Sequence, residues 1–530
     1  MDEAGRLLRR LQDILDEAER AREPVPAVLV GTLSATATRA ARLQGSGTFF
    51  TVQYQPIFPL LELPDGLISL VLSHLPALWL ARHMSTCCAF GRFGQAAVSM
   101  RLTMLGQVLP TLKPGEAATH ALRFAELLAR APRATLAAGE SHSLFLSWDG
   151  LLRSCGGDFL DDDQETPFVG HLGHGEEWGE AVARPTAVRL PAAVRAHSVA
   201  AGGYLSMLLS EEGREAWSWG GCGHGHGGHA GNVLLPTRLP TLAGVRVAQL
   251  ACGSQHCLVL TAEGALHACG NNSHGELGVG DRAARASPTR LDSLPSRMRF
   301  CAVSAGGSHS LCIEASGAVL TWGHGGAGRL GHGDVASHTL PKRVDTLVGS
   351  AARLVCGGGM HSLMVAGERL HACGYKGDGR LGLGGPDGRG ANIYDVGAEP
   401  VAGAFKPQPV DVDDLVFGGR RFRQIACGDH HSAALVEAPL EVFAWGKGED
   451  GRCGHGCEAS QLVPRRVLFC SAAAVAISIV EIGAGSDHTL ARASDGRVYA
   501  FGLGGQGQLG LGDLENQALP RQVGLDAGPG

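Results

Sequence analysis

Short apolar segments separated by polar turns recur at a regular interval along the C-terminal three quarters of the chain. Each recurrence opens with Gly, two variable positions and usually His-Ser, as in Gly306–Ser310. Two apolar runs joined by a turn follow, and the second ends on a large apolar residue or Cys before Gly, as in Trp322-Gly323. A Leu-Gly-x-Gly segment such as Leu330–Gly333 comes next. Acidic-Gly or Ser-Gly turns between apolar runs indicate β-hairpins, because glycine tolerates the positive φ of a tight turn.

The pattern occurs seven times, which predicts a closed ring of β-sheets. The repeated His position falls at these residues: His142, Leu205, His256, His309, His361, His431 and His488. Spacings of 51 to 70 residues, with hairpins and no helical pattern, indicate a β array. Propellers of about four to eight four-stranded blades protect their sheet edges. We therefore predict an all-β seven-bladed propeller over residues 134–530.

The repeat resembles that of the regulator-of-chromosome-condensation family. The resemblance rests on the Gly-x-x-His-Ser, Trp-Gly and Leu-Gly-x-Gly elements in series, and it covers about residues 134–530. It implies the seven-bladed β-propeller of that family. The repeat also accounts for four Gly-x-Gly-x-x-Gly matches, because a dinucleotide-binding loop needs a helix after it and none is predicted there. These matches are Gly223–Gly228, Gly323–Gly328, Gly446–Gly451 and Gly502–Gly507.

A different pattern fills the first quarter of the chain and predicts helices. Residues 1–30 place leucine and isoleucine on one face of a charged, amphipathic helix. Residues 31–60, rich in Ala, Ser, Thr and Gly over much of their length, are expected to form a linker. Residues 61–133 predict a small α-helical region, in which Leu63-Pro64 opens a helix because the missing N–H of proline has no partner in a first turn.

This helical region resembles an F-box, a family that opens with Leu-Pro and continues with short helices closing on Cys and aromatic residues. The match covers about residues 61–100, but Gly66 stands where the family usually has an acid, and Ala77–Trp79 replace polar residues. The resemblance implies docking to a Skp-type adaptor through apolar side chains of one helix. The expected contact residues are Leu63, Pro64, Leu67, Ile68, Val71, Leu72 and Leu75. A plain helical cap on the propeller is the alternative.

Composition and charge narrow the class of protein. The formal net charge is −6 and no sustained basic stripe is present, so direct nucleic-acid binding is not expected. Several of the 15 cysteines occupy slots that are Ala, Trp or Phe in other copies, so we expect reduced core residues. The chain shows no secretory signal and no apolar run approaching ~20 residues. An intracellular protein, cytoplasmic or nuclear and without a membrane contact, is expected.

The titratable residues predict no active site. Six equivalent His-bearing copies indicate architecture, and each buried imidazole is expected to hydrogen-bond the backbone between strands. No asymmetric set of nucleophile, base and acid stands out. His224, His226 and His229 near Cys222 lack a paired Cys-x-x-Cys module, so neither a metal nor another cofactor is predicted.

Two departures from the repeat are candidate contact sites on the propeller. An acidic loop in the first copy contains Asp161, Asp162 and Asp163, and it lacks the ligand order of a calcium loop. An insertion near Gly385–Val410 accounts for the longest spacing, and such insertions map to loops on one face. Either segment is a candidate for partner contact, and a solvated loop is the alternative for the acidic segment.

Together these features predict a non-catalytic scaffold for protein interaction. The F-box resemblance makes it the substrate-recognition subunit of a Skp–cullin ubiquitin ligase, with the propeller binding an unknown substrate protein. The alternative, implied by the propeller family, is guanine-nucleotide exchange on a Ran-like GTPase. Light sensing, known for a plant member of that family, is not expected, because Trp219, Trp322 and Trp445 are spread over alternate repeats as core residues.

Overall fold

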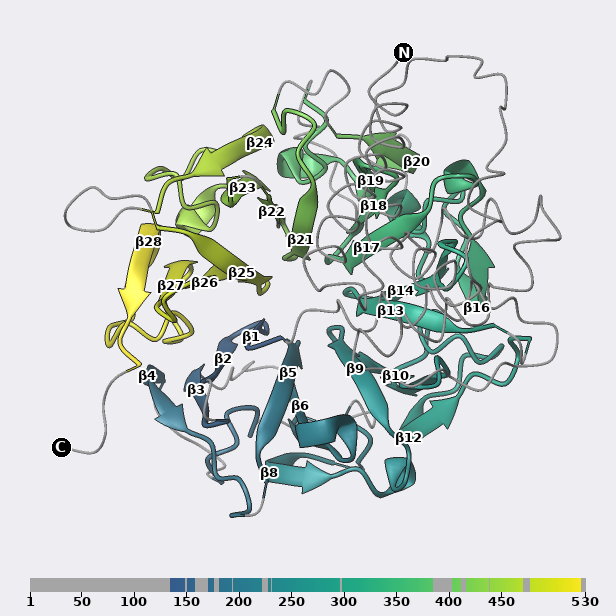
Figure 1. Cartoon of the computed structure of the whole chain (residues 1–530), viewed down its shortest axis with the longest axis horizontal. Helices are drawn as coiled ribbons and strands as arrows, with labels where there is room; N and C mark the ends of the chain where they lie inside the picture. The colour runs from purple at the N-terminus through teal and green to yellow at the C-terminus, as the bar shows by residue number, and fades with distance from the viewer. Residues whose placement is uncertain are drawn as a thin grey trace, which may run out of the picture. The chain divides into compact units, whose positions relative to one another are not determined.

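The C-terminal part of the chain is a ring of seven β-sheets. The computed structural model describes residues 134–525, apart from 148–149, 158–169, 176–180, 193, 222–226, 230, 296–297, 385–402, 411–415, 438 and 470–476. In this described part the regular elements are strands and short 3-10 helices. Each sheet has four antiparallel strands that are consecutive in sequence, and the sheets stand around a central axis as blades (Figure 1).

The strands of each blade are numbered outward from the axis. Blades 1 and 2 comprise β1 (Leu136–Ala138), β2 (His142–Leu146), β3 (Leu152–Gly156), β4 (Val182–Ala187), β5 (Ala196–Gly202), β6 (Leu205–Ser210), β7 (Ala216–Gly220) and β8 (Val233–Arg238). Blades 3 and 4 comprise β9 (Val247–Cys252), β10 (His256–Thr261), β11 (Leu266–Gly270), β12 (Arg285–Arg290), β13 (Phe300–Ala305), β14 (His309–Glu314), β15 (Val319–Gly323) and β16 (His338–Arg343).

The remaining three blades follow the same order. They comprise β17 (Ala352–Gly357), β18 (His361–Ala366), β19 (Arg369–Tyr375), β20 (Gly403–Pro409), β21 (Phe422–Cys427), β22 (His431–Val436), β23 (Glu441–Gly446), β24 (Gln461–Val467), β25 (Ile479–Ala484), β26 (His488–Ala493), β27 (Val498–Gly502) and β28 (Gln517–Val523). Single 3-10 turns lie in the connections: η1 (Glu211–Gly213), η2 (Pro240–Leu242), η3 (Gly326–Gly328), η4 (Asp345–Leu347), η5 (Gly377–Gly379) and η6 (Glu449–Gly451).

This architecture confirms the predicted seven-bladed propeller. The F-box-like segment at residues 61–133 lies outside the described residues. Within the described residues, none of the helices has the length and apolar character needed to span a bilayer. The Gly-x-Gly-x-x-Gly matches at Gly323–Gly328, Gly446–Gly451 and Gly502–Gly507 each begin at the end of a third strand, at one blade position as predicted. The first two run into single 3-10 turns.

The apolar core lies between neighbouring blades. The second strand of a blade is buried on both faces, as the six residues of β18 and β22 show. Between blades 5 and 6, Leu363 and Val365 of one sheet pack with Phe443 and Trp445 of the next. At the Trp slot, Trp219, Trp322, Trp445 and Phe501 have no exposed surface, and Cys155, Cys269 and Cys373 share that burial. The prediction that these three cysteines are core residues is confirmed.

The glycine after the Trp slot is required by its backbone conformation. Gly446 has φ +110°, and a Cβ there would lie 2.6 Å from the carbonyl oxygen of His430. A side chain would therefore both strain the backbone and collide with the neighbouring strand. This explains why Gly directly follows the Trp slot in the third strand of each blade.

The repeated His joins each blade to the next. Its Nε2 lies within hydrogen-bond distance of a hydroxyl oxygen on the second strand of the following blade. The pairs are His142–Ser206 (2.8 Å), His256–Ser310 (2.9 Å), His309–Ser362 (2.8 Å), His361–Ser432 (2.8 Å), His431–Thr489 (2.8 Å) and His488–Ser143 (2.8 Å). The expectation of a backbone partner was wrong, because the partner is a side chain of the neighbouring blade.

The direction of this hydrogen bond follows from a second contact of the hydroxyl. Ser362 donates its only hydroxyl proton to the carbonyl oxygen of Arg329 at 2.7 Å, so it must accept from His309 Nε2–H. Space explains the glycine three positions earlier: a Cβ on Gly306 would lie 2.4 Å from His309 Cε1. The Gly-x-x-His-Ser element therefore encodes an interblade joint.

The joint between blades 2 and 3 lacks this hydrogen bond. Leu205 occupies the His position of blade 2, and Cys257 occupies the Ser position of blade 3. Both side chains are buried in one apolar cluster. Donor and acceptor have thus been replaced together, so neither is left without a partner.

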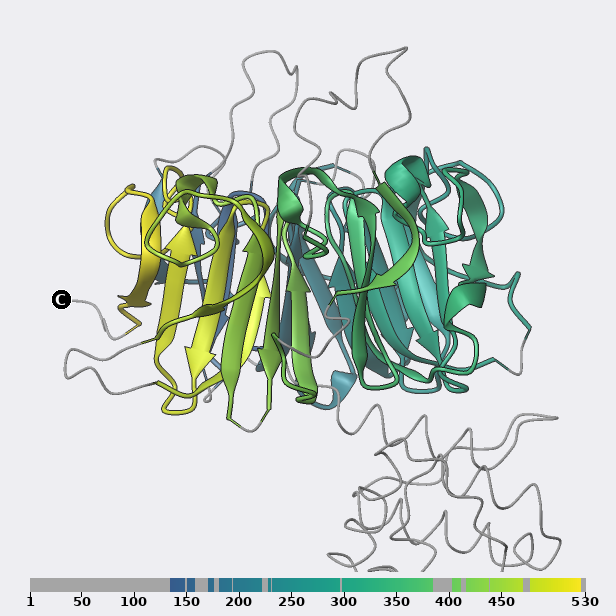
Figure 2. The same cartoon turned by 90° about the horizontal axis from the view of Figure 1, so that it is seen from above.

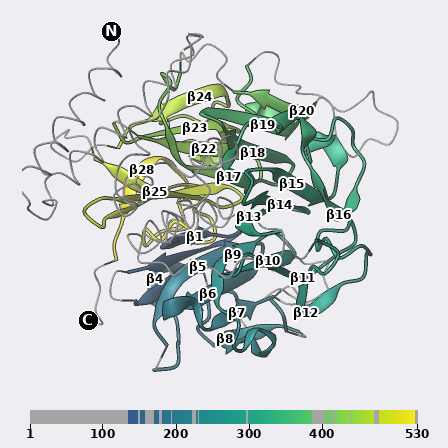
Figure 3. The same cartoon turned by 45° about the vertical axis from the view of Figure 1, so that its right-hand side comes forward.

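The ring closes where blade 7 meets blade 1. Figure 3 shows β25 beside β1, and no strand is exchanged between the two sheets. Besides the His488–Ser143 pair, Glu481 Oε1 accepts from the backbone N–H groups of Thr135 at 2.7 Å and Leu136 at 3.1 Å. The seam is therefore held by packing, by these side chains, and by a hydrogen bond from Ser486 N–H to the carbonyl oxygen of Gly139 at 3.2 Å.

Removing one joint hydroxyl should be more costly than replacing the whole joint. Ser362→Ala leaves the buried His309 Nε2–H without an acceptor, and we expect a loss of about 1–3 kcal/mol in the free energy of unfolding. The double variant His309→Leu/Ser362→Cys copies the blade 2–3 joint and should lose less. Urea unfolding curves measure both, with the exposed Ser350→Ala as control. A double variant less stable than the single one would contradict this account.

The joint histidines should make the propeller sensitive to acid. Burial lowers the pKa of His142, His309, His361 and His431 well below the ordinary value, and that of His488 to about 3. Histidines of the unfolded chain have a pKa of about 6.5, so unfolding takes up protons below that pH. Stability should therefore fall as the pH drops from about 7 to 5.

The matched variant His309→Leu/Ser362→Cys lacks one of these histidines. Its unfolding midpoint, followed over the same pH range, should show a shallower dependence than that of the unaltered chain. Equal slopes for the two proteins would show that the joint histidines are not the groups that take up the protons.

Candidate functional site: the charged rim of the loop face

The two faces of the ring carry different loops. In each blade the loop between the first and second strands, such as residues 139–141, lies on the same face as the connection between the third and fourth strands, because neighbouring strands are antiparallel. We call this the loop face. The short turns between second and third strands and the connections between blades lie on the opposite face, and Figure 2 shows both faces edge-on.

The axis of the ring opens onto the loop face through a small cavity. It has a volume of about 70 Å³, and Gly, Ala, Ser and Cys from the ends of the inner strands provide most of its lining. Among the described residues that line it, Asp429 carries the one carboxylate. Pockets for small molecules usually measure about 300–1,000 Å³. The arrangement therefore suits a partner resting on the face better than a ligand inside the ring.

Acidic residues occupy the variable positions of Gly-x-x-His on neighbouring blades. These are Glu140 of blade 1, Asp429 of blade 6 and Asp487 of blade 7. The corresponding positions of blades 2 to 5 carry Gly, Tyr, Ser, Gln or Met. The repeat is thus uneven in charge, and its carboxylates gather on one side of the central opening.

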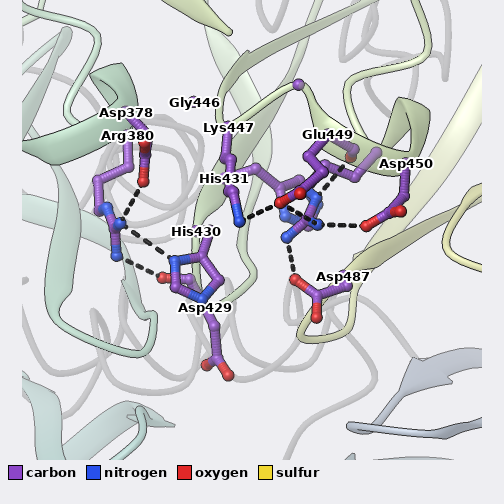
Figure 4. A network of polar contacts seen from close by, with 12 residues as sticks. Asp378, Arg380, Asp429, His430, His431, Gly446, Lys447, Glu449, Asp450 and Asp487 are labelled. Atoms are coloured by element: carbon purple, nitrogen blue, oxygen red, sulfur yellow. Dashed lines mark hydrogen bonds and ion pairs between the residues drawn. The ribbon is translucent and has the colours of Figure 1, made fainter. Parts of the chain in front are cut away.

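A buried arginine connects blade 5 to this acidic side. Arg380 is 2% exposed, and its Nη1 donates to the backbone carbonyl of Asp429 at 2.9 Å (Figure 4). Its Nη2 lies 2.9 Å from Asp378 Oδ2 and 3.1 Å from His430 Nδ1. The guanidinium therefore fixes the loop of blade 6 while being neutralised by an acid of its own blade.

Arg452 repeats this arrangement between blades 6 and 7. It is also 2% exposed, its Nη2 lies 2.6 Å from Asp450 Oδ2, and its Nη1 forms an ion pair with Asp487. Lys447 forms an ion pair with Glu449 (Figure 4). We call the set Glu140, Asp378, Arg380, Asp429, His430, Lys447, Glu449, Asp450, Arg452 and Asp487 the charged rim.

Equivalent positions of the repeat supply the arginines and their acids. Arg380 and Arg452 each precede a Leu-Gly-x-Gly segment or its variant, and the acids two positions earlier, Asp378 and Asp450, both have φ +58°. Aspartate tolerates this left-handed conformation better than most residues. Blade 4 has Arg329 at the same position, and its Nη1 donates to the carbonyl of Gly359 at 3.0 Å. The charged rim is therefore a local elaboration of a repeated interblade contact.

Burial and neighbouring charges raise the pKa values of two acids of the rim. Burial raises the pKa of Glu140, and Asp429 raises it further. Burial also raises the pKa of Asp487, against the opposing effect of Arg452. Carboxylates this crowded would be stabilised by a cation from a partner.

The rim offers hydrogen-bonding groups to a partner. Burial first, and then Arg380, lower the pKa of His430, which keeps its imidazole neutral. Because Nδ1 accepts from Arg380, the proton of the neutral ring lies on Nε2. Figure 4 shows the carboxylate of Asp429 pointing away from both arginines. The rim therefore combines a donor and an unneutralised acceptor at its surface.

The His–Ser pairs of the joints are not arranged for catalysis. Ser362, for example, has no exposed surface, and it uses its hydroxyl proton on the carbonyl of Arg329. Among the described residues, no group of three or more His, Cys, Asp or Glu could hold a metal ion. The described part of the site is thus suited to binding.

The predicted contact residues lie outside the part that the structure describes. This holds for the F-box-like set from Leu63 to Leu75 and for Asp161, Asp162 and Asp163. Of the insertion, residues 385–402 are also outside it, while residues 403–409 form β20. These segments stay predictions.

The sequence analysis missed the charged rim, although signals for it exist. Arginine precedes Leu-Gly-x-Gly or its variant in three consecutive copies, at Arg329, Arg380 and Arg452. Asp429 and Asp487 stand in the variable positions of Gly-x-x-His in the copies that follow the second and third of these arginines. The coincidence of both departures in blades 5 to 7 marks the rim.

Comparison with known families assigns the repeat. The regulator of chromosome condensation (RCC1) repeat matches residues 215–260, 263–313, 316–365, 368–435, 441–492 and 495–528. The unit at 263–313 contains β11 and β12 of blade 3 together with β13 and nearly all of β14 of blade 4. A sequence repeat therefore spans two half-blades and includes the joint between them.

Individual relatives and solved structures agree with this assignment. The chain is 30% identical over 394 residues to the ultraviolet-B receptor UVR8 of Arabidopsis thaliana, covering 73% of this chain and 81% of the receptor. It is 33% identical over 311 residues to the E3 ubiquitin-protein ligase HERC2 of Homo sapiens, covering 57% of this chain but 6% of the ligase.

Two solved structures share the fold. Prp20p from Saccharomyces cerevisiae has a TM-score of 0.58 at 22% identity, covering 72% of this chain and 87% of its own. Human WBSCR16 has a TM-score of 0.54 at 24% identity, covering 66% of this chain and 86% of its own. Repeat, ring and relatives lead to one conclusion: the chain belongs to the regulator of chromosome condensation (RCC1) repeat family.

Proposed function

We propose that the chain is a non-catalytic interaction protein whose loop face binds a protein partner through the charged rim. The observation that carries this proposal is the gathering of Glu140, Asp429 and Asp487 on adjacent blades around the central opening. Charges arranged on one side of a face select partners by complementarity. The fitting partner is a protein that presents lysine or arginine at its contact surface.

The finer proposal concerns the assembly in which the propeller acts. The F-box-like segment, with Leu67 and Val71 at its centre, would bind a Skp-type adaptor, and the loop face would hold the substrate of a cullin-based ubiquitin ligase. Similarity to part of HERC2, a ubiquitin-protein ligase, supports a link to this chemistry. Other subunits would carry out the transfer of ubiquitin.

Light reception, the role in the name of UVR8, is not proposed for this chain. Trp219, Trp322 and Trp445 lie in blades 2, 4 and 6 and have no exposed surface. Each donates its indole N–H to a backbone carbonyl in the preceding blade, at 2.7–3.0 Å. Their hydrogen bonds and burial account for them as core residues.

Charge reversal at the rim should weaken binding of a basic partner. The carboxylate of Asp429 points away from both arginines, so Asp429→Lys changes the surface without removing an ion partner of either one. We expect an immobilised Lys/Arg-rich peptide to bind the chain in low salt, and Asp429→Lys to weaken binding about tenfold, roughly 1.4 kcal/mol. Asp345→Lys, an exposed position on the opposite face, is the control. Equal effects of both reversals would contradict a specific rim.

Adaptor binding tests the ubiquitin-ligase assignment. The full chain should co-purify with a Skp-type adaptor, and Leu67→Asp combined with Val71→Asp should abolish this, because charges cannot enter an apolar groove without cost. Val348→Asp, at an exposed apolar residue of the propeller, should leave the complex intact. Absence of any complex with the unaltered chain would refute this assignment. Faster GDP release from a Ran-like GTPase would favour nucleotide exchange instead.

A further inference from the structure

Two cysteines meet between the inner strands of blades 5 and 6. Cys356 lies in β17, and Cys427 ends β21. Cys427 Sγ lies 3.6 Å from the carbonyl oxygen of Cys356, and the electrostatic effect of the Cys427 thiol reaches the Cys356 thiol. Both residues are half-buried, and Cys427 borders the central cavity. The pair is therefore close enough to react together and lies beside the opening.

The surroundings of Cys356 favour its thiolate. The thiol of Cys427 is the largest cause of a lowered pKa at Cys356, and Ser304 of blade 4 contributes a further hydrogen bond. Gly357 N–H donates to Ser304 Oγ at 3.0 Å, which leaves the hydroxyl proton for the sulfur. Burial instead raises the pKa of Cys427. The two thiols thus differ, with Cys356 as the nucleophile and Cys427 as its protonated neighbour.

A second close pair provides an internal comparison. Cys252 and Cys257 lie opposite each other in blade 3, with their sulfurs 3.7 Å apart. Cys257 is fully buried, and burial raises its pKa well above the ordinary value. In both pairs the two cysteines lie close together. The pKa is lowered at Cys356, whereas it is raised at Cys257.

We propose that Cys356 and Cys427 form a thiol modification site at which a peroxide produces a disulfide between blades 5 and 6. The Cys356 thiolate attacks hydrogen peroxide, the O–O bond breaks, and Cys356 sulfenic acid and hydroxide result. Cys427 sulfur then attacks the sulfenic sulfur, the S–O bond breaks, and the thiol proton leaves with the oxygen as water. Overall, two thiols are oxidised by two electrons, and one peroxide is reduced to water.

The position of the pair connects it to the charged rim. Cys427 is followed by Asp429 and His430, the residues that contact Arg380. Gly359 lies three residues after Cys356, and the carboxylate of Asp429 packs against it. A Cβ on Gly359 would lie 2.8 Å from Asp429 Oδ1. A disulfide would thus tie the strand before the rim loop of blade 6 to the strand before the Gly359 loop of blade 5, which Asp429 contacts.

Peptide mass spectrometry after peroxide treatment tests the proposal. The reduced full chain, treated with an equimolar amount of hydrogen peroxide, should yield a Cys356–Cys427 disulfide before any Cys252–Cys257 disulfide. In Cys427→Ser the sulfenic acid has no resolving thiol, so a dimedone adduct should accumulate on Cys356. Cys356→Ser should remove both products, and Cys252→Ser should remove neither.

Two further measurements distinguish a thiol activated by its surroundings from one that is simply accessible. Cys457 is exposed and serves as the comparison for simple access. In the folded chain Cys356 should be oxidised faster than Cys457, and Ser304→Ala should slow Cys356 several-fold without affecting Cys457. Preferential oxidation of Cys457, oxidation of Cys252–Cys257 first, or a missing adduct on Cys356 in folded Cys427→Ser would overturn the proposal.

Discussion

The propeller depends on one hydrogen bond, repeated at six of its seven joints, from a buried imidazole to a hydroxyl of the next blade. Each sheet alone would leave a polar hydroxyl and a ring N–H in an apolar layer, and burying such groups without partners is costly. The joint satisfies both, and the hydroxyl passes its own proton to a backbone carbonyl, as Ser310 does to Glu276 at 2.7 Å. Neighbouring blades are thereby held in one register.

The same carbonyl organises the residues around it. Trp322 donates its indole N–H to Glu276 O, and Trp445 donates to Arg380 O. In blade 5 the thiol of Cys373 lies 3.5 Å from Arg329 O, in the same slot. The backbone of the residue that provides this carbonyl is therefore fixed, while its side chain varies between blades. Blades 4, 5 and 6 have arginine there, and in blades 5 and 6 this arginine belongs to the charged rim.

The fold could be predicted from the sequence because the interblade joint needs Gly, His and Ser, and few other residues can take their places. Gly, His and Ser at fixed spacing mark the loop, the donor and the acceptor in most copies, so seven copies imply seven blades. It could not reach the partner of the histidine, because Ser362 lies 53 residues from His309 and nothing local links them. Periodicity shows that positions are equivalent, and contacts between copies become visible in three dimensions.

The candidate site was harder to predict from the sequence, because its residues also come from different copies of the repeat. Asp429 and Asp487 look like ordinary surface acids in sequence, and the distance from Arg380 to Asp429 is 49 residues. The loop at Asp161 attracted attention because its acids are adjacent in sequence, whereas the acids of the rim are adjacent in space. In this repeat protein, departures at equivalent positions of the copies are the signal that marks the acids of the rim.

The seam between the last and first blades has a consequence for how the ring assembles. Interior joints connect residues 53 to 71 positions apart, as His309–Ser362 and His361–Ser432 do, whereas His488 and Ser143 are separated by 345. Loop-closure entropy and folding time both grow with such separation. The arc of blades can therefore form by successive local docking, with closure of the circle as the late and slow event. Until that moment the facing surfaces of blades 1 and 7 would be uncovered, and the backbone N–H groups of Thr135 and Leu136 would lack their acceptor on Glu481.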